Sequence, residues 1–422
     1  MLGANYMTPD WVIVTLWFVA GITATGGFWY FLDSKNVAGA IGSVCITVAA
    51  VAVAILLRLR NDRLHRLGSG SLPARLLAFI WSYPLTGENE ASWAVKESTA
   101  LRGDLGTARE NPALGVAIVT TELALAAFGD VANSRIDLCV SWGVGHAQRH
   151  PPYQMLAANR EPIHDEKVVK VDFRHTLAFA VILARTRKQR DYLLSHVRLA
   201  LARQCEDGGW PSDSVMTISP VFTAFYGIEL LHLASADSSI PVEISNAIPA
   251  ARENALKWLM NQSGSDGLWS SSVFRDFAWD RVFTAAWVLH RLAQTANVAV
   301  DGWRQCLDDA AFVMIQQALD SQSWLGASEA QRHRVEARIA AAASRAQLIP
   351  GLSSRSVDSL QLYLGSWVER AKHWLARLPA DELDVGTAAF LVDAMVPTER
   401  LRELGRRVRK AEESGNRAKS SP

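Results

Sequence analysis

Cysteine is scarce in this chain of 422 residues. The four cysteines are Cys45, Cys139, Cys205 and Cys306, and they lie far apart without a CxxC pair. Zinc sites built on cysteine and disulfide-stapled domains both need a recognisable cysteine framework. The spacing therefore excludes such a framework and predicts free thiols in a reducing compartment.

An excess of charge of either sign is also missing. The chain has 43 Lys and Arg against 42 Asp and Glu, a formal net charge of +1. Nucleic-acid binders usually carry a strong basic excess, so we expect no nucleic-acid partner. An apolar share of 49% and a mean hydropathy slightly above zero instead suit a membrane-attached protein with one large globular domain.

Two N-terminal runs, residues 11–32 and 37–57, contain no charged residue. About twenty apolar residues cross the hydrocarbon core of a bilayer as a helix, so these runs predict two transmembrane spans. A signal peptide is the alternative. It is disfavoured because no Lys or Arg precedes Trp11 and because a second apolar run follows.

Basic residues predict the orientation of this hairpin. Five arginines follow the second span: Arg58, Arg60, Arg63, Arg66 and Arg75. The four-residue connection Asp33–Asn36 contains one Lys. The positive-inside rule places the N-terminus and the large domain in the cytoplasm, on a multi-pass protein of the inner (cell) membrane. Small residues in the second span permit packing within one hairpin or, alternatively, a homo-oligomer of several hairpins.

The rest of the chain is organised around two similar corners. Residues 199–211 read LALARQCEDGGWP, and residues 258–269 read WLMNQSGSDGLW. In each, a helix ends near a Gln, an Asp-Gly pair turns the chain, and a Trp precedes an apolar helix. Gly permits a positive φ, Asp accepts bonds from nearby amides, and Trp supplies a large apolar plate with one donor. The pattern predicts helical hairpins stacked as repeats.

Five apolar helices share a Thr followed by small and apolar residues. These register threonines are Thr121, Thr176, Thr223, Thr284 and Thr387, separated by 55, 47, 61 and 103 residues. The last gap is about two repeats, so one unit has lost its signature. We expect that unit within Ala340–Leu364, where AAAAS or SVDSLQLYL would supply it. The prediction is an all-α fold of six helical hairpins.

The sequence WLMNQSGSDGLW resembles the QW motif of the terpenoid cyclases, and QCEDGGW is a weaker copy. Over about Leu76–Pro397, the chain is similar to the (α/α)6 toroid shared by squalene/hopene cyclases and the β subunits of protein prenyltransferases. The resemblance implies two concentric rings of helices, with the Thr-bearing helices inside, around a central cavity.

The resulting domain plan has four parts. Residues 1–57 form the transmembrane hairpin, 58–75 a basic juxtamembrane linker with a flexible break at Gly68–Pro73, and 76–398 the toroid. Residues 399–422 are expected to form a frayed helix and a basic, disordered tail. This tail either is merely solvated or touches anionic lipid of the bilayer.

The catalytic motifs of the resembling families are not found in the sequence. A DxDD cluster is absent, and the nearest stretch, Asp381–Asp384, reads as the cap of a helix N-terminus. DDxxD is absent as well. Where the prenyltransferases hold zinc, this chain has Leu268 in place of a Cys and Phe283 in place of a His. The sequence therefore predicts no catalytic residue, no metal and no cofactor.

Polar residues before two register threonines form the candidate ligand site. With aromatic residues of the corners and the helix between them, the set is Asp172, Arg174, His175, Trp210, Tyr226, Trp269, Arg275, Asp276, Asp280 and Arg281. Arginine beside aromatic faces suits a phosphate or diphosphate, so an isoprenoid or phosphate-bearing ligand is expected. The alternatives are helix capping with a local Asp276–Arg281 ion pair, or acid–base catalysis.

Three functions remain open on the sequence. The first is a non-catalytic membrane effector or sensor that binds a ligand or a protein, for which bacterial anti-phage membrane effectors offer an analogy. The second is an isoprenoid-processing enzyme that takes its substrate from the bilayer. The third is a structural protein that assembles through its spans.

Overall fold

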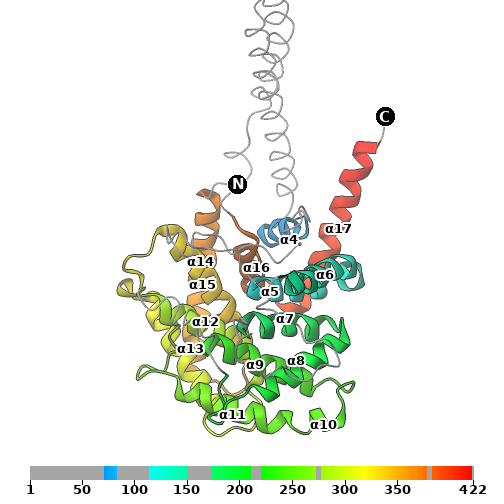
Figure 1. The fold of residues 1–422 in the computed structure, drawn as a ribbon. Coiled ribbons are helices and arrows are strands. Elements are labelled where there is room, and N and C mark those ends of the chain that lie inside the picture. Colours follow the sequence, from blue (N-terminus) through cyan, green and yellow to red (C-terminus); the bar gives the residue numbers. More distant parts are fainter. Residues whose placement is uncertain are drawn as a thin grey trace, which may run out of the picture.

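The computed structural model describes residues 71–82, 114–149, 173–210, 220–271, 277–377 and 383–420, and within these ranges it is all-helical (Figure 1). The all-α prediction is confirmed for this part of the chain. The predicted spans at 11–32 and 37–57 lie outside the described residues.

Six helices, here called the ring helices, contact one another in a closed circle. Each contacts the next in the order α5, α7, α9, α12, α14 and α16, and α16 contacts α5 again. Their bounds are α5 Leu114–Phe128, α7 Phe173–Thr186, α9 Pro220–Ser235, α12 Asp280–Leu292, α14 Glu329–Ala346 and α16 Val385–Met395. All five predicted Thr-bearing helices are ring helices.

The other helices pack against the ring helices, with two short exceptions. They are α4 Leu72–Ser82, α6 Asn133–Arg149, α8 Arg190–Ala202, α10 Val242–Ser245, α11 Ile248–Asn261, α13 Trp303–Leu319, α15 Ser354–Arg377 and α17 Thr398–Ser420, with short 3-10 helices η3 Gly129–Ala132, η6 Ala293–Thr295 and η7 Ser321–Trp324. The exceptions are α10, which contacts α11, and η7, which contacts α13. Helix α8 contacts α7 and α9, α13 contacts α12 and α14, and α17 contacts α5. Each hairpin thus pairs a ring helix with an outer one.

The two kinds of helix differ in sequence pattern. Every residue from Val221 to Leu231 of α9 is buried, as expected for a helix that is apolar on all faces. Helix α15 instead buries one stripe at helical spacing, which includes Leu360, Tyr363 and Trp367. Such a stripe covers one neighbour and leaves the opposite face in water.

Both predicted corners have the same geometry. The indole Nε1 of Trp210 donates to the carbonyl of Ala200 at 2.8 Å, and Trp269 donates to Leu259 at 2.8 Å. At the turn, Gly208 and Gly267 adopt φ of +95° and +79°. The interval along the chain between the two tryptophans equals that between the two glycines. The corners are therefore one repeated unit in three dimensions as well as in sequence.

The Asp of each corner also binds the next outer helix. Asp207 accepts a bond from Trp258 on α11 at 3.1 Å, and Asp266 accepts one from Gln317 on α13 at 3.1 Å. Trp258 and Gln317 are separated by the same interval as the two aspartates, so they occupy equivalent repeat positions. The corner Asp thus joins successive hairpins, which explains the stacking that the repeat pattern predicts.

A third corner lies where the repeat has lost its signature. Gly326 has a φ of +77°. Along the chain it lies as far after Gly267 as Gly267 lies after Gly208. The indole of Trp324 donates to the carbonyl of Ala318 at 3.1 Å, and Ala318 is the repeat equivalent of Leu259. This corner leads into the ring helix α14.

The third corner decides between the two stretches considered for the missing unit. Helix α14 contains AAAAS, whereas SVDSLQLYL lies in the outer helix α15. The first stretch is therefore the correct one.

Of the frayed helix and disordered tail expected at 399–422, the structure describes the helix. Helix α17 runs to Ser420, and its Leu401 and Val408 are buried against the body. Because Gly405 has no side chain, α17 approaches α5 closely, and a Cβ there would lie 2.1 Å from the Ala127 carbonyl. Two buried residues and one glycine were too weak a pattern to predict this contact.

One helical stretch of the described residues, Val116–Ser141, is long and apolar enough to cross a membrane by length and composition alone. More than half of its most apolar window is buried within the protein. The first half of this stretch belongs to α5, which contacts α7, α16 and α17, so we describe that half as part of a ring helix of the core.

The equivalence of the corners can be tested with glycine substitutions. A Cβ at Gly267 or Gly326 would meet no atom within 4 Å, so Ala there changes only the left-handed backbone. We expect G267A and G326A each to lower the free energy of unfolding by about 1–2 kcal/mol. G365A, inside α15 with equally open space, should raise it by about 1 kcal/mol. Chemical unfolding in detergent, followed by tryptophan fluorescence, measures all three. Unchanged stability of G326A would contradict the third corner.

Candidate functional site

Asp280 of the predicted ligand site is used to hold its own corner. It is buried, and its carboxylate accepts bonds from the Ser271 amide at 2.9 Å, the Ser271 hydroxyl at 2.5 Å and the Ser270 hydroxyl at 2.6 Å. Since these two serines directly follow Trp269, Asp280 ties the end of the corner to the first turn of α12.

Arg281 has a similar role one residue later. Its guanidinium forms an ion pair with Asp266 and donates to the Leu268 carbonyl at 2.7 Å. The partner of Arg281 is therefore the corner Asp that also binds α13. Asp280 does not cap α12, because the N-cap position is Trp279 and has no side-chain cap bond. Arg281 forms an ion pair, but with Asp266 in place of the Asp276 that the sequence suggested.

The aromatic members of the predicted site are buried. Trp210 and Trp269 donate their indole N–H groups within the corners, and Trp210 also packs on α9, where a Cβ at Gly227 would lie 2.7 Å from its ring. Tyr226 lies beside Phe225 in the ring interior, with ring centroids 4.3 Å apart. The structure thus brings Trp210 and Tyr226 to one helix, and Trp269, Asp280 and Arg281 to the next corner.

The remaining predicted residues precede α7 and α12. Arg174 is half-buried in the first turn of α7. Asp172, Arg275, Asp276 and the side chain of His175 lie outside the described residues, so a ligand site formed by the whole set stays a prediction.

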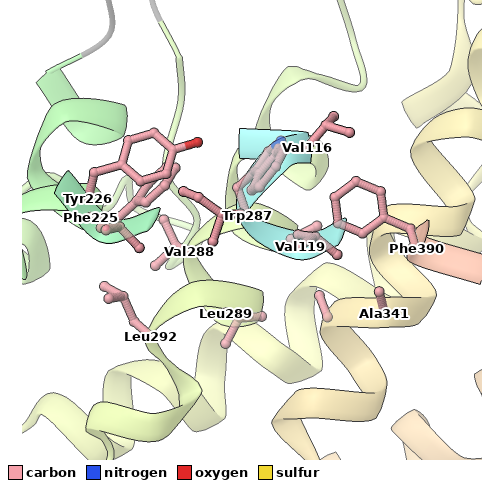
Figure 2. Close-up of a cluster of buried hydrophobic side chains, with 14 of the residues drawn as sticks. Val116, Val119, Phe225, Tyr226, Trp287, Val288, Leu289, Leu292, Ala341 and Phe390 are labelled. Carbon is pink, nitrogen blue, oxygen red and sulfur yellow. The ribbon is translucent and has the colours of Figure 1, made fainter. Parts of the chain in front are cut away.

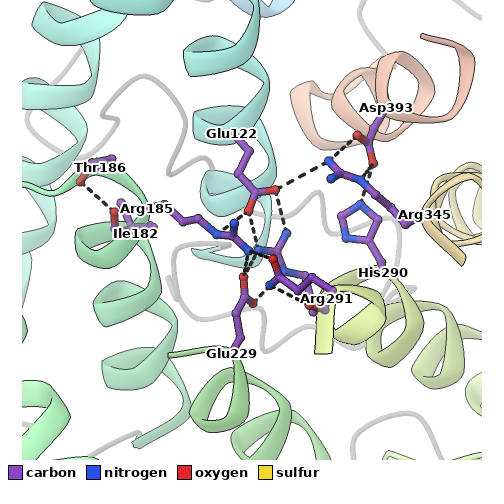
Figure 3. Close-up of polar contacts among 10 residues, drawn as sticks. Glu122, Ile182, Arg185, Thr186, Glu229, His290, Arg291, Arg345 and Asp393 are labelled. Carbon is purple, nitrogen blue, oxygen red and sulfur yellow. Dashed lines mark hydrogen bonds and ion pairs between the residues drawn. The ribbon is translucent and has the colours of Figure 1, made fainter. Parts of the chain in front are cut away.

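A different polar cluster, which the sequence analysis did not identify, lies toward the C-terminal ends of the ring helices (Figure 3). We call it the hub. Each ring helix contributes one charged residue, and α12 adds a histidine: Glu122, Arg185, Glu229, Arg291, Arg345 and Asp393, with His290. Three arginines and three carboxylates leave the hub without net charge at neutral pH, apart from His290.

Arg291 is the centre of one half of the hub. It donates to Glu229 at 2.8 Å from Nε and forms a two-pronged pair with Glu122 at 2.8 and 3.1 Å. Arg185 bridges the same two carboxylates at 2.9 Å each. Only 2% of the Arg291 side chain and none of the Glu229 side chain is exposed. Such bidentate, buried pairs are the strong form of an ion pair.

Asp393 is the centre of the other half. It accepts two bonds from Arg345, at 2.7 and 3.1 Å, and one from His290 Nε2 at 2.8 Å (Figure 3). Arg345 also lies 3.9 Å from Glu122, which joins the two halves. The hub thus connects helices on opposite sides of the ring as well as neighbours.

The partners determine the ionisation of the hub. Burial lowers the pKa of Arg291, but Glu122 and Glu229 outweigh burial and raise this pKa well above its usual value. Burial raises the pKa of Asp393, yet the bonds from His290 and Arg345 bring it below the ordinary range. For His290, burial dominates and lowers the pKa despite Asp393. The hub is therefore an ionised network with a neutral histidine.

An aromatic layer fills the ring next to the hub, toward the N-terminal ends of the ring helices (Figure 2). Three of its members stand three residues after a register threonine: Tyr226, Trp287 and Phe390. Phe179 has the same position in α7, but its ring lies against Gly143 of α6 and His196 of α8. The ring centroid of Trp287 lies 6.2 Å from that of Phe225 and 5.4 Å from that of Phe390. These contacts fill the ring axis with side chains at this level, where the resemblance implies a cavity.

Arg338 of α14 lies against this layer. Its guanidinium carbon is 5.0 Å from the ring centroid of Phe283, 5.6 Å from that of Trp287 and 5.3 Å from that of Phe390. A guanidinium within about 6 Å of an aromatic face is attracted by the ring. The side chain is almost fully buried, with 5% exposed.

The sequence did contain a signal for the hub. Glu229 and Asp393 each follow their register threonine by six residues, and Arg291 follows Thr284 by seven. Charged residues at nearly the same position of otherwise apolar helices indicate that these charges meet inside, although Glu122 and Arg185 do not share this position. Within the described residues, no group of three or more His, Cys, Asp and Glu is placed to hold a metal ion.

Comparison with known proteins gives no family for this chain. No protein-family model and no curated protein matches the sequence.

Removal of one hub carboxylate should destabilise the protein strongly. E229Q keeps the shape of the side chain but leaves Arg185 and Arg291 with one buried carboxylate fewer, so we expect a loss of about 3–5 kcal/mol. The matched control is E253Q, which removes an exposed pair with Lys257 and should cost less than about 1 kcal/mol. Chemical unfolding of the full chain in detergent measures both. Equal losses in the two variants would contradict a stabilising hub.

The hub also predicts how stability depends on pH. A group whose pKa is lower in the folded than in the unfolded state stabilises the fold at pH values above its pKa in the unfolded state. This stabilisation is lost as the pH falls below that pKa. For His290 the loss begins near pH 6.5, and for Asp393 near pH 4. Burial also lowers the pKa of His196 and His232, which contribute to the same decrease. H290Q should therefore lessen the decrease in unfolding free energy between about pH 6.5 and 5, by at most about 1.4 kcal/mol per pH unit.

Unfolding curves at pH 7.5, 6.5, 5.5 and 4.5 test this expectation. H373Q, which removes an exposed histidine of α15, is the matched control and should keep the decrease. The interpretation is wrong if H290Q and the unsubstituted chain lose stability in parallel over this range.

Proposed function

We propose that this protein is a membrane-tethered (α/α)6 toroid that works as a non-catalytic binding effector or sensor. The closed circle of six ring helices supports the toroid, as do three corners whose turn glycines Gly208, Gly267 and Gly326 are equally spaced along the chain. The two apolar runs without charge at 11–32 and 37–57 support the tether. In this proposal, the ring binds a ligand from the cytoplasm or the bilayer, or a protein, and the spans respond to whether the ring is occupied.

The hub is the observation that carries the proposal. Acid–base or nucleophilic catalysis needs polar groups that can change partner during the reaction. The hub carboxylates instead accept several bonds each from arginines of the same chain, and Asp280 and Arg281 hold a corner. These groups serve to hold the ring together as one rigid unit. Such a unit suits binding and transmission.

The tether limits where a signal arises. Five arginines after residue 57 favour the cytoplasmic side for the domain, and only four residues join the spans outside. An external ligand would have almost no protein surface to bind. The proposed ligand or partner is therefore cytoplasmic, or it comes from the bilayer.

Isoprenoid binding or processing is the second candidate, and the aromatic layer favours it. Trp287 and Phe390 pack edge to face, and the guanidinium of Arg338 lies over both rings. Aromatic faces with an arginine suit a polyprenyl chain with a phosphate or diphosphate head, and such a ligand would enter the ring only where these packed side chains move aside.

A ligand and turnover experiment separates these functions. The full chain is purified in detergent, its bound small molecules are identified by native mass spectrometry, and it is then incubated with geranylgeranyl diphosphate. The effector proposal predicts no release of diphosphate and no consumption of the isoprenoid. Turnover that is lost in R338Q and R338K but kept in R304Q, an exposed arginine of α13, would overturn it. A discrete oligomer without bound ligand would favour the third reading, a structural assembly.

A further inference from the structure

Helix α17 concentrates the positive charge of the protein. Thr398–Ser420 contains eight Lys and Arg against four Glu, a net charge of +4. Because the whole chain has a net charge of +1, the remaining residues sum to −3. Positive charge is therefore concentrated in this helix, as it is in the basic linker 58–75, whereas the protein as a whole is nearly neutral.

This charge lies on the face of α17 that does not touch the body. Leu401 and Val408 are buried against the body, and Gly405 approaches Ala127 of α5. The exposed side chains of the opposite face include Arg402, Arg406, Arg407 and Lys410. One face of the helix is thus fixed to the ring, and the other presents basic groups to the surroundings.

Local ion pairs do not cancel this charge. Arg407 pairs with Glu403, and Arg409 lies 3.6 Å from Glu413. Both are surface pairs between residues four apart, which contribute little energy and are easily exchanged for another anion. The net charge of +4 already counts the glutamates, so a basic surface remains after pairing.

The position of α17 determines the partner that we choose. It contacts α4, whose first residue, Leu72, is where the chain arrives from the proposed spans. The fourteen residues 58–71 reach at most about 50 Å when fully extended. In Figure 1, the second half of α17 extends beyond the body on the side where α4 lies. The basic face therefore lies on the side of the body at which the chain arrives from the proposed spans.

We propose that the exposed basic face of α17 binds the anionic phospholipid headgroups of the membrane that holds the tether, and so fixes the orientation of the ring relative to the bilayer. The inference rests on the proposed tether, because the tether supplies the proximity. Each basic side chain near an anionic membrane surface strengthens binding by about fivefold, so several together act well above thermal energy.

Hydrogen exchange in nanodiscs tests this proposal with the full chain. One set of discs contains only phosphatidylcholine, and the other contains phosphatidylcholine with about a quarter phosphatidylserine. We expect the backbone amides of residues 409–420 to exchange at least about fivefold more slowly in the anionic discs. This protection should disappear at high salt, because screening shortens the reach of the charges.

Two triple variants make the test specific. R406Q/R407Q/K410Q removes three charges from the exposed face and should abolish the difference between the discs. K257Q/R304Q/K372Q removes three exposed charges from α11, α13 and α15 and should keep it. Unchanged helicity by circular dichroism and unchanged exchange of the ring helices show that each variant is folded.

Failure of the tether and failure of the lipid contact are distinguishable. If the chain does not insert into discs of either composition, the tether is wrong, and the lipid contact is lost with it. If it inserts but residues 409–420 exchange equally in both discs, the tether stands and the lipid contact is wrong. Protection of these residues in neutral discs by an added RNA oligonucleotide, with none from phosphatidylserine, would overturn the proposal in favour of a nucleic-acid contact.

Discussion

Arg291 is buried between Glu122 and Glu229, two carboxylates that come from two other ring helices. A buried guanidinium is costly unless its donors are all directed at acceptors, and here the acceptors belong to α5 and α9. The pairing is satisfied only when these helices and α12 face one common axis. Asp393 imposes the same condition on α12, α14 and α16 through His290 and Arg345. The arrangement of the ring therefore depends on the hub.

The corners and the hub act over different ranges. A corner joins one hairpin to the next, as when Asp207 binds Trp258, and a chain built only of such contacts would be an open array. The hub connects residues as distant as Glu122 and Arg291, 169 positions apart, and thereby links the first ring helix to later ones. Local repetition builds the stack, and long-range charge pairing favours its closure.

Helix α14 shows how one repeat has diverged inside the ring. It lacks the register threonine, and it carries Arg334, Arg338 and Arg345 at helical spacing on one face. Arg334 binds Asp384, the N-terminal cap of α16, Arg338 lies against the aromatic layer, and Arg345 joins the hub. The unit that lost the sequence signature therefore supplies cations at three levels of the ring. If the proposed toroid binds an anionic ligand within the ring, α14 is the helix that would recognise it.

Patterns along the chain specify the helices and their repetition. Apolar helices after Asp-Gly turns, the tryptophans of both corners, the cap at Asp384 and five of the six ring helices follow from short-range patterns along the chain. The partners of the charged residues depend on the tertiary structure, because they lie on helices far apart in sequence. Asp280 and Arg281 appear from sequence as ligand groups, but the folded chain brings Ser271 and Asp266 to them. The hub could be suspected from charges in apolar helices, yet only the closed ring decides which acid meets which arginine. The physical reason is that helix formation is local, whereas the pairing of buried charges requires the complete ring.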